Sequence, residues 1–284
     1  MCFIDLHVHS NASDGTLSPR EVVLLAQEAG LSAIALTDHD TTAGTAEAMA
    51  AGEETGVRVI PGIEVSSSYE DKELHILGLF VHPGEAGFED FLKAMRARRD
   101  RRNEEMLARF ARDGITFTQE ELTGGNPDTV ITRAHVARAL LARGAGSSRE
   151  QIFKKYLQYG GRYCPLKEHF PPEEVVRILL ENGAFVSLAH PFQYRLGDRA
   201  TEQLIARLAS LGMQGLEVYH SSHNPLEVKK LSSIARRLRL LPTGGSDFHG
   251  ANKPDIQIGT GRGGLRLPIS LLEDIEKRLA EENR

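Results

Sequence analysis

The sequence is poor in cysteine, with only Cys2 and Cys164 among 284 residues and no CxxC pair. Such isolated cysteines exclude the disulfide framework of a small secreted domain and suit a reducing compartment. No apolar run approaches the roughly 18 residues of a membrane-spanning helix. Asp5 and His7 interrupt the short apolar start, which rules out a recognisable signal peptide. We therefore expect a cytoplasmic protein with no membrane partner.

An excess of positive charge is also missing. Lysine and arginine total 34 against 39 aspartate and glutamate, giving a formal net charge of −5 and a pI near 6.1. This balance excludes wholesale electrostatic attraction to nucleic acid or to an anionic membrane. Any anionic ligand must be recruited by local residues. Internal repeats and low-complexity tracts are absent too, and a hydrophobic content of 40% is typical of a globular protein.

The chain does contain apolar runs of strand length that alternate with amphipathic stretches of helix length. This alternation is typical of βα units and predicts an α/β fold, specifically a seven-stranded (β/α) barrel. One predicted helix begins after Ser18, its N-cap, with Pro19 in the first turn, and stops at Gly30. We expect strands at residues 3–8, 33–36, 57–63, 74–80, 184–188, 215–218 and 240–243.

A helical insertion interrupts the alternation. From residue 87 to residue 163 the pattern is helical throughout, as in FEDFLKAMRARRDRRNEEMLARFARDG and TRAHVARALLARG. We therefore expect residues 1–86 and 164–284 to form the barrel and residues 87–163 to form a helical subdomain that caps the active site. The arginine run of this segment, residues 96–102, is interleaved with acidic residues and predicts a solvated helix rather than a nucleic-acid surface.

Histidines and carboxylates follow most of the predicted strands. In a βα barrel the carboxyl ends of the strands meet at one rim, where active sites form. His7 and His9 lie two residues apart on a strand, so both side chains leave the same face and can chelate one ion. The residues expected at this rim are His7, His9, Asp14, Asp38, His39, Glu64, His75, His190, His220, Asp247 and His249.

This donor set favours a metal site. Imidazole and carboxylate without thiolate suit Mn, Fe, Zn or Mg better than a structural zinc. A single histidine such as His82 is more simply a packed core or surface residue, but that explanation is weak for the whole set at one rim.

Six strings along the chain resemble the successive motifs of the polymerase and histidinol phosphatase (PHP) superfamily: HVHSNASDG, TDHD, PGIEVS, HILGL, SLAHP and GSDFHG. The resemblance implies a distorted seven-stranded βα barrel with an inserted helical subdomain and two or three divalent metal ions, with Mn the expected metal. It implies that Glu64 bridges two ions. The implied ligands are His7, His9, Glu64 and Asp247 for the first ion, His75, His190 and Glu64 for the second, and Asp14, His39 and His249 for the third.

Further strings, including TRAHVARAL and YLQYGGRYCP, are most similar to the 3′,5′-nucleoside bisphosphate phosphatase branch of this superfamily. That branch removes the 3′-phosphate from nucleotides such as adenosine 3′,5′-bisphosphate. This chain has Arg133-Ala134-His135 where the branch has Arg-Pro-His. The missing proline affects the rigidity of a helix start more than its chemistry.

The insertion also contains a predicted phosphate site. Thr132 is a plausible N-cap, which places Arg133 and His135 in the first helical turn beside free backbone N–H groups that bind phosphate well. Arg133 can add bidentate contacts to a phosphate that is not cleaved, and Arg162, after a Gly-Gly turn, is a weaker candidate. The simpler alternative for both arginines is a solvated surface cation.

The chemistry implied is hydrolysis of a phosphate ester by a metal-bound hydroxide, without a protein nucleophile. A metal-bound water, Asp38 or His220 can transfer a proton to the leaving oxygen, and the preferred interpretation of Asp38 is a group that orients its neighbours.

Two other classes of function stay open. One is another PHP hydrolase, either a histidinol phosphate phosphatase or a 5′ to 3′ exoribonuclease acting on short RNA ends. The other is a metal-free, non-catalytic binding module. The sequence indicates no protein partner, and it leaves the base preference, the native metal, the number of ions bound, the proton donor, the oligomeric state and the pathway undetermined.

Overall fold

The computed structural model describes residues 2–70, 72–125, 129, 131–166 and 170–282. Its strands are β1 (Phe3–Val8), β2 (Leu31–Leu36), β3 (Arg58–Tyr69), β4 (Lys72–Leu79), β5 (Phe185–Leu188), β6 (Gly215–His220), β7 (Leu241–Gly245) and β8 (Leu267–Pro268). Its α-helices are α1 (Pro19–Glu28), α2 (Thr45–Thr55), α3 (Ala86–Arg112), α4 (Gln119–Thr123), α5 (Arg133–Ala142), α6 (Arg149–Tyr156), α7 (Pro172–Glu181), α8 (Asp198–Ser210), α9 (Pro225–Leu238) and α10 (Ser270–Glu282). Two 3₁₀ helices are η1 (Pro191–Tyr194) and η2 (Gly250–Asn252).

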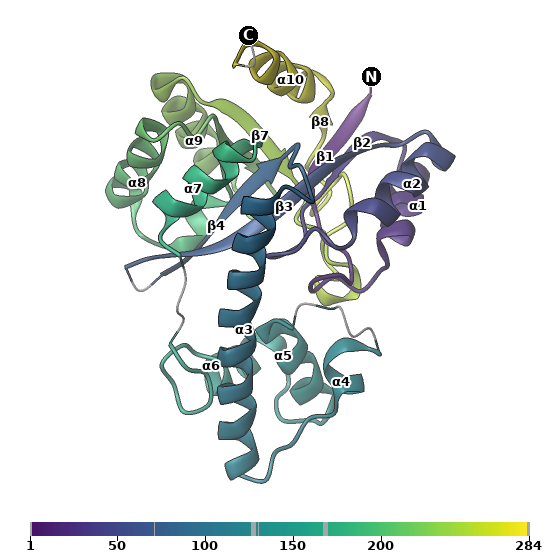
Figure 1. Cartoon of the computed structure of the whole chain (residues 1–284), viewed down its shortest axis with the longest axis vertical. Helices are drawn as coiled ribbons and strands as arrows, with labels where there is room; N and C mark the ends of the chain where they lie inside the picture. The colour runs from purple at the N-terminus through teal and green to yellow at the C-terminus, as the bar shows by residue number, and fades with distance from the viewer. Residues whose placement is uncertain (1, 71, 126–128, 130, 167–169, 283–284) are drawn as a thin grey trace.

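The strands form one mixed sheet in the order β7-β6-β5-β4-β3-β2-β1-β8. The sheet curls into a nearly closed barrel, because the segment after β7 returns to β1 (Figure 1). Asp247 N–H donates to the His7 carbonyl at 2.9 Å, and His9 N–H donates to the Phe248 carbonyl at 3.0 Å. These bonds bring the carboxyl ends of the first and seventh strands together, where side chains from both can share a ligand.

Strand β4 departs from the predicted βα alternation. It follows β3 without a helix and pairs antiparallel with both β3 and β5, with Glu64 opposite Leu77 and Ser66 opposite His75. Strand β3 also runs beyond the predicted end, so Glu64 lies in its middle. In this extension of the strand Ser66 and Ser67 are buried, and Ser67 donates to the Phe170 carbonyl at 2.9 Å.

The seven predicted strands are present, with shifted ends, and a short eighth strand accompanies them. Strand β8 pairs antiparallel with the start of β1. Helix α10 follows it, and its Leu272 and Ile275 pack with Ile4 and Leu6 of β1 in one buried cluster. Figure 1 shows α10 and β8 at the end of the barrel opposite α4, α5 and α6. The carboxyl rim of the parallel strands therefore faces the inserted helices.

Helix α3 links the barrel to the other helices of the segment between β4 and β5 (Figure 1). Its first turns bury Phe88 and Met95 in the cluster that contains β4 and α7. Its last turns bury Met106 and Phe110 in a separate cluster with α4, α5 and α6. Among the described residues, no helix is long and apolar enough to span a membrane.

A candidate metal centre and anion pocket

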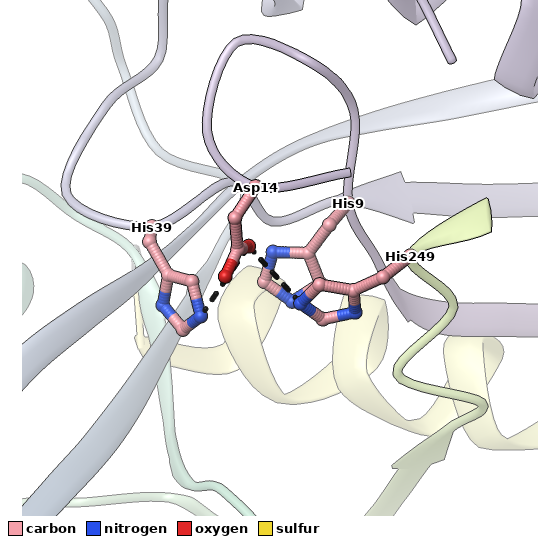
Figure 2. Close-up of side chains that lie close together, drawn as sticks. All are labelled: His9, Asp14, His39 and His249. Atoms are coloured by element: carbon pink, nitrogen blue, oxygen red, sulfur yellow. Dashed lines mark ion pairs between the residues drawn. The ribbon is translucent and has the colours of Figure 1, made fainter. Parts of the chain in front are cut away.

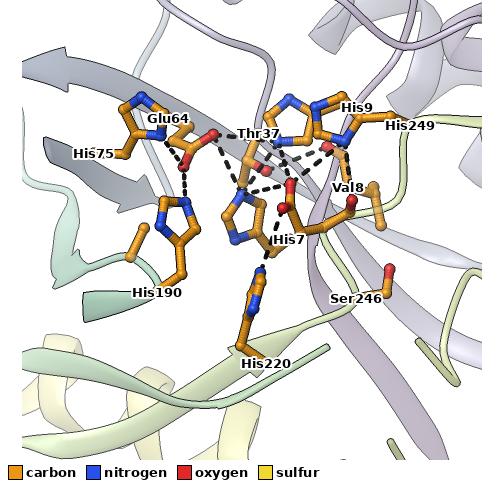
Figure 3. Close-up of polar contacts among 12 residues, drawn as sticks. His7, Val8, His9, Thr37, Glu64, His75, His190, His220, Ser246 and His249 are labelled. Atoms are coloured by element: carbon orange, nitrogen blue, oxygen red, sulfur yellow. Dashed lines mark hydrogen bonds and ion pairs between the residues drawn. The ribbon is translucent and has the colours of Figure 1, made fainter. Parts of the chain in front are cut away.

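Glu64 lies in a cluster of buried and half-buried histidines, several of which Figure 3 shows. Its Oε1 is 2.8 Å from His190 Nε2 and 3.0 Å from His75 Nδ1. Its Oε2 is 3.4 Å from His7 Nε2, 3.3 Å from His9 Nε2 and 3.1 Å from His39 Nδ1. The two carboxylate oxygens therefore face two different groups of imidazole nitrogens, which is the arrangement of a bridging carboxylate.

His7 and His9 converge as their spacing on one strand predicts. Their Nε2 atoms are 3.1 Å apart, and Asp247 Oδ1 is 3.8 Å from the first and 3.5 Å from the second. Asp247 is held in a left-handed backbone conformation with φ 59° at the end of β7. Ligands bonded to one ion at about 2.1 Å lie roughly 3.4 Å apart in a tetrahedron, so these separations fit a shared cation.

A second group surrounds Asp14 (Figure 2). Asp14 Oδ1 lies 3.1 Å from His249 Nε2 and 3.8 Å from His39 Nε2. His9, Asp14, His39 and His249 each offer one ligand atom to this group, and the four atoms lie within 4.8 Å of one another. The loop that carries Asp14 starts directly after β1, so a short stretch of chain supplies ligands to both groups.

Unpaired polar atoms support a cation at this place. Glu64 Oε2, Asp14 Oδ1, His39 Nδ1 and His75 Nδ1 are buried and have no hydrogen-bond partner of good geometry among the described residues, although they face one another closely. Buried polar atoms are rarely left unpaired, and an ion is one of the standard reasons. The imidazole and carboxylate donors suit a divalent cation such as Mn or Zn.

The charges in the cluster shift the pKa values of its members. Burial raises the pKa of the Glu64 carboxyl, but His75, His39 and His7 lower it by more than burial raises it. The pKa of Glu64 therefore lies well below its usual range. Burial lowers the pKa of His75, but the Glu64 carboxylate raises it, to about 10. Burial lowers the pKa of His190 to about 4. The site therefore combines ionised carboxylates with both neutral and charged imidazoles, and metal binding must displace protons from the charged ones.

Glu217 of β6 is a buried residue to which the sequence reasoning gave no role. Its Oε1 is 2.9 Å from His7 Nδ1, and its Oε2 accepts the His190 backbone N–H at 2.7 Å. A carboxylate on one ring nitrogen fixes the tautomer and leaves the other nitrogen directed at the cluster. The sequence signal for Glu217 was its place beside His220 at the end of a predicted strand, at the rim where active-site residues of a βα barrel gather.

An anion pocket of about 160 Å³ opens beside Asp14, His39, His75 and His249. Its cationic side chains are Arg99 and Arg102 of α3, Arg133 of α5, Arg149 of α6, and Lys253. These five cations outnumber the two carboxylates of the lining, Asp14 and Glu73, which favours an anionic ligand in a protein whose net charge is negative.

Two of these arginines contradict the prediction of a solvated helix. Arg99 and Arg102 are each 8% exposed. Arg99 forms an ion pair with Asp40 and donates to Ser66 Oγ at 3.0 Å. Acidic residues between arginines are typical of a solvated helix, which is why the sequence predicted one here. The packing of α3 against the barrel instead turns this face of the helix inward.

Arg133 begins α5 as predicted, with Thr132 as the N-cap. Its guanidinium stacks on the Tyr159 ring at 3.6 Å and pairs with Glu73 at 3.1 Å. Glu73 Oε1 in turn is 3.5 Å from His75 Nε2. One carboxylate therefore connects a cation of the anion pocket to a histidine of the metal cluster.

His135 and Arg162 do not line the pocket. His135 is buried behind it, where its Nδ1 accepts the Thr132 backbone N–H at 2.9 Å and completes the helix cap. The side chain of Arg162 is 72% exposed and pairs with Asp113 at 2.7 Å. The Gly-Gly turn before Arg162 directs its side chain toward Asp113, at the end of α3, and its predicted contact with substrate stays a prediction.

Asp38 has no contact with the open part of the site. Its oxygens accept from Ser10 N–H at 2.9 Å, Ser10 Oγ at 2.6 Å and Ser13 Oγ at 2.5 Å. These bonds hold the loop that carries Asp14, which fits the orienting role expected for Asp38. His220 lies at the rim, with its Nε2 3.4 Å from Asp247 Oδ2 and its Nδ1 2.8 Å from Ser222 Oγ.

Comparisons with known proteins agree with this geometry. The model of the PHP domain family matches residues 5–164. The chain is 36% identical over 261 residues, 91% of each chain, to a 3′,5′-nucleoside bisphosphate phosphatase of Chromobacterium violaceum. It is 33% identical over 247 residues, 86% of this chain and 84% of the other, to the 5′-3′ exoribonuclease Rnm of Escherichia coli.

A solved structure from Bifidobacterium adolescentis, classed as a metal-dependent phosphoesterase, superposes with a TM-score of 0.85 at 34% identity and covers 97% of this chain and 96% of its own. The family match covers more than half of this chain, and the cluster of imidazoles and carboxylates provides donors for divalent ions. The chain therefore belongs to the PHP family and is a metal-dependent hydrolase of phosphate esters.

Proposed function

We propose that the protein removes the 3′-phosphate from nucleoside 3′,5′-bisphosphates. The observation that carries this proposal is the arginine-rich anion pocket beside the metal cluster. A substrate with a phosphate on each side of a ribose can place one phosphate at the metal cluster and the other on the arginines. A monophosphate can use only one of these two anion sites.

We further propose that the metal cluster holds about two or three divalent ions, Mn among them. His7, His9, Glu64 and Asp247 would hold the first ion, His75, His190 and Glu64 the second, and Asp14, His39 and His249 the third. When bound, such ions supply a nucleophile from water near neutral pH and stabilise charge on the phosphoryl oxygens and the leaving oxygen.

Protein side chains have separate roles in this proposal. Glu217 keeps His7 in the tautomer whose Nε2 faces the cluster. His220, hydrogen-bonded to Ser222 and close to Asp247, is positioned to hold a proton at the rim. Asp38 keeps the Asp14 loop in place.

In the anion pocket, Arg133 holds the phosphate that is not cleaved. Its stacking on Tyr159 and its pairing with Glu73 restrict the guanidinium before any ligand binds, which lowers the entropic cost of binding. Arg99 and Arg149 add charge from two other helices. Residues 87–163 would then be the subdomain that caps the active site, since α3, α5 and α6 each place an arginine in the pocket and share a hydrophobic cluster of their own.

A substrate comparison tests the proposal. We expect Mn²⁺-reconstituted protein to hydrolyse a nucleoside 3′,5′-bisphosphate with a higher kcat/KM than the corresponding 3′-monophosphate, the 5′-monophosphate or histidinol phosphate. The products should be inorganic phosphate and the nucleoside 5′-monophosphate.

Three outcomes would contradict the proposal. Equal kcat/KM on the bisphosphate and the 3′-monophosphate would show that the second phosphate is not recognised. A nucleoside 3′-monophosphate as product would reverse the two phosphate sites. Fully metal-loaded protein without hydrolysis of any of these esters would indicate a binding module.

A further inference from the structure

Glu73 of β4 lies between the anion pocket and the metal cluster. Glu73 and His75 are two residues apart on the strand, so both side chains leave the same face, while Leu74 between them is fully buried on the other face. Both Glu73 and His75 line the anion pocket. A carboxylate repels a phosphate bound nearby, so the place of Glu73 in this pocket needs a physical reason.

The two carboxylate oxygens of Glu73 have different partners. Its Oε2 accepts hydrogen bonds from Arg133 Nη2 at 3.1 Å and from the Tyr159 hydroxyl at 3.0 Å. Its Oε1 is 3.5 Å from His75 Nε2. The first oxygen therefore contacts residues of the anion pocket, and the second faces a histidine of the metal cluster.

His75 lies between two carboxylates. Its Nδ1 is 3.0 Å from Glu64 Oε1, a contact that Figure 3 shows, and its Nε2 faces Glu73. A carboxylate that accepts the N–H of one ring nitrogen leaves the other nitrogen as the ligand atom and fixes the orientation of the ring. Glu217 contacts His7 in this way, at 2.9 Å. Glu73 is placed to do for His75 what Glu217 does for His7.

Arg133 is held by three groups. Its Nη1 donates to the Leu157 carbonyl at 3.0 Å, its Nη2 donates to Glu73, and its guanidinium lies on the Tyr159 ring. A guanidinium has five N–H donors, so these contacts leave others for a phosphate. Loss of Glu73 would remove the charged one of these three restraints, and ordering the guanidinium on a phosphate would then cost more conformational entropy.

We propose that Glu73 is a positioning residue for both parts of the site. It holds Arg133 for the phosphate that is not cleaved, and it directs Nδ1 of His75 at the metal cluster. The identity of that phosphate rests on the proposed function, whereas the contact with His75 does not depend on the substrate. Because one carboxylate restricts both partners, substitution of Glu73 should weaken metal binding and nucleotide binding together.

Metal binding tests the contact with His75. Mn²⁺ alone is titrated into metal-free protein in a calorimeter at one fixed pH. We expect Glu73→Gln to weaken the binding of at least one ion by roughly 10- to 100-fold, the usual cost of losing a carboxylate behind a ligating histidine. Glu73→Asp keeps the charge but is one methylene shorter, so its affinity should lie between those of Glu73→Gln and wild type. Glu105→Gln, which removes a carboxylate paired with Arg109 at an exposed position of α3, is the matched control.

Nucleotide binding tests the contact with Arg133. A nucleoside 5′-monophosphate, the expected product, is titrated into protein saturated with Mn²⁺. We expect roughly five- to tenfold weaker binding to Glu73→Gln, because a charge-assisted hydrogen bond becomes a weaker one. A carboxylate that only repelled phosphate would give the opposite sign, with tighter binding once its charge is removed. At saturating Mn²⁺, the same substitution should raise KM for the bisphosphate and leave KM for the 3′-monophosphate nearly unchanged.

The outcomes separate the two roles of Glu73 from the proposed function. Wild-type Mn²⁺ affinity in Glu73→Gln would overturn the role toward His75, and unchanged or tighter nucleotide binding would overturn the role toward Arg133. If Glu73→Gln lost its cooperative thermal unfolding, Glu73→Asp would carry the same two comparisons. Wild-type hydrolysis of the bisphosphate no faster than that of the 3′-monophosphate would overturn the proposed function instead, and the Mn²⁺ titration would still decide the role toward His75.

Discussion

At the scale of single residues, Glu64 faces five histidines, more than any other carboxylate among the described residues of the metal cluster. It lies in the middle of β3, with one oxygen facing His75 and His190 and the other facing His7, His9 and His39. An amide in its place would supply only one oxygen and no charge. Two groups of imidazoles would then lose the anion that they share.

We therefore expect Glu64→Gln to lower kcat by more than about 100-fold, because losing partners outside the ligand shell already costs 10- to 100-fold in metal sites. Metal content measured after dialysis should fall in parallel. Glu53→Gln, a change of the same kind at an exposed position of α2, is the control. Near-normal turnover with full metal content in Glu64→Gln would show that Glu64 does not bridge.

Arg133 tests the anion pocket. Arg133→Ala should cost about 2 to 4 kcal/mol in kcat/KM on a 3′,5′-bisphosphate, the range for removing one partner of a buried charge pair. The loss on a 3′-monophosphate should be much smaller, since that substrate lacks the second phosphate. Steady-state kinetics on both substrates makes the comparison. Arg162→Ala, at the surface, should change neither, and equal losses on both substrates in Arg133→Ala would place Arg133 in a structural role.

At the scale of elements, helix α3 joins two cores. Its 27 residues bury Phe88 among barrel residues near one end and Phe110 among the inserted helices near the other, while Arg99 and Arg102 face the anion pocket between them. Phe110 stacks on Tyr163 at 4.1 Å between ring centroids. The position of the pocket arginines therefore depends on packing at both ends of the helix.

Phe110→Ala and Phe88→Ala form a matched pair on this helix. Each should destabilise the region around it by about 3 to 5 kcal/mol, the usual cost of a phenylalanine cavity. Hydrogen exchange should show lost protection in α4, α5 and α6 for Phe110→Ala, and in β4 and α7 for Phe88→Ala. If both variants lost protection throughout the chain alike, residues 87–163 would not be a separate subdomain.

At the scale of the whole molecule, the protein has a net charge of −5, yet five cationic side chains line its anion pocket. Arginines from three helices and Lys253 converge where the carboxylates of the cluster would be neutralised by bound ions. Ions that bind only the folded protein stabilise it by mass action. We expect about two or three divalent ions per chain, with chelation both abolishing hydrolysis and lowering Tm. Less than about one ion per chain, with hydrolysis unaffected by chelator, would contradict the assigned centre.

The stability of metal-free protein should depend on pH with two opposite slopes. His39 and His190 have folded pKa values of about 4, below the usual 6.5, so stability rises as pH increases from 4 to 6.5. His75 has a folded pKa of about 10, so its contribution is complete below 6.5 and is lost as pH rises toward 10. Bound Mn²⁺ replaces the proton of His75 and should remove the alkaline decline.

Thermal unfolding measured from pH 4 to pH 10, with chelator and with Mn²⁺, checks this expectation. A flat Tm between pH 6.5 and pH 10 in chelator would show that His75 is not charged in the metal-free fold.

The cytoplasmic location expected from the sequence stays a prediction.

The spacing of residues that are close in sequence was sufficient to predict much of the molecule. The spacing of His7 and His9 placed both rings on one face of β1, and Thr132 and Ser18 were recognised as N-caps because capping depends on residues within one turn. The six motifs indicated the PHP family before any contact was known. The helical segment between the fourth and fifth strands was also readable, since helical periodicity is a property of consecutive residues.

Tertiary packing decided the rest. The sequence does not state that β4 runs antiparallel to β3, which brings His75 opposite Ser66 and toward Glu64. Nor does it state which face of α3 meets the barrel, so Arg99 and Arg102 looked solvated. Glu217 acquired its role only from His7, 210 residues earlier in the chain. Periodicity and capping involve neighbours in sequence, whereas these contacts join segments whose register and orientation are fixed only when the whole barrel buries its apolar surface.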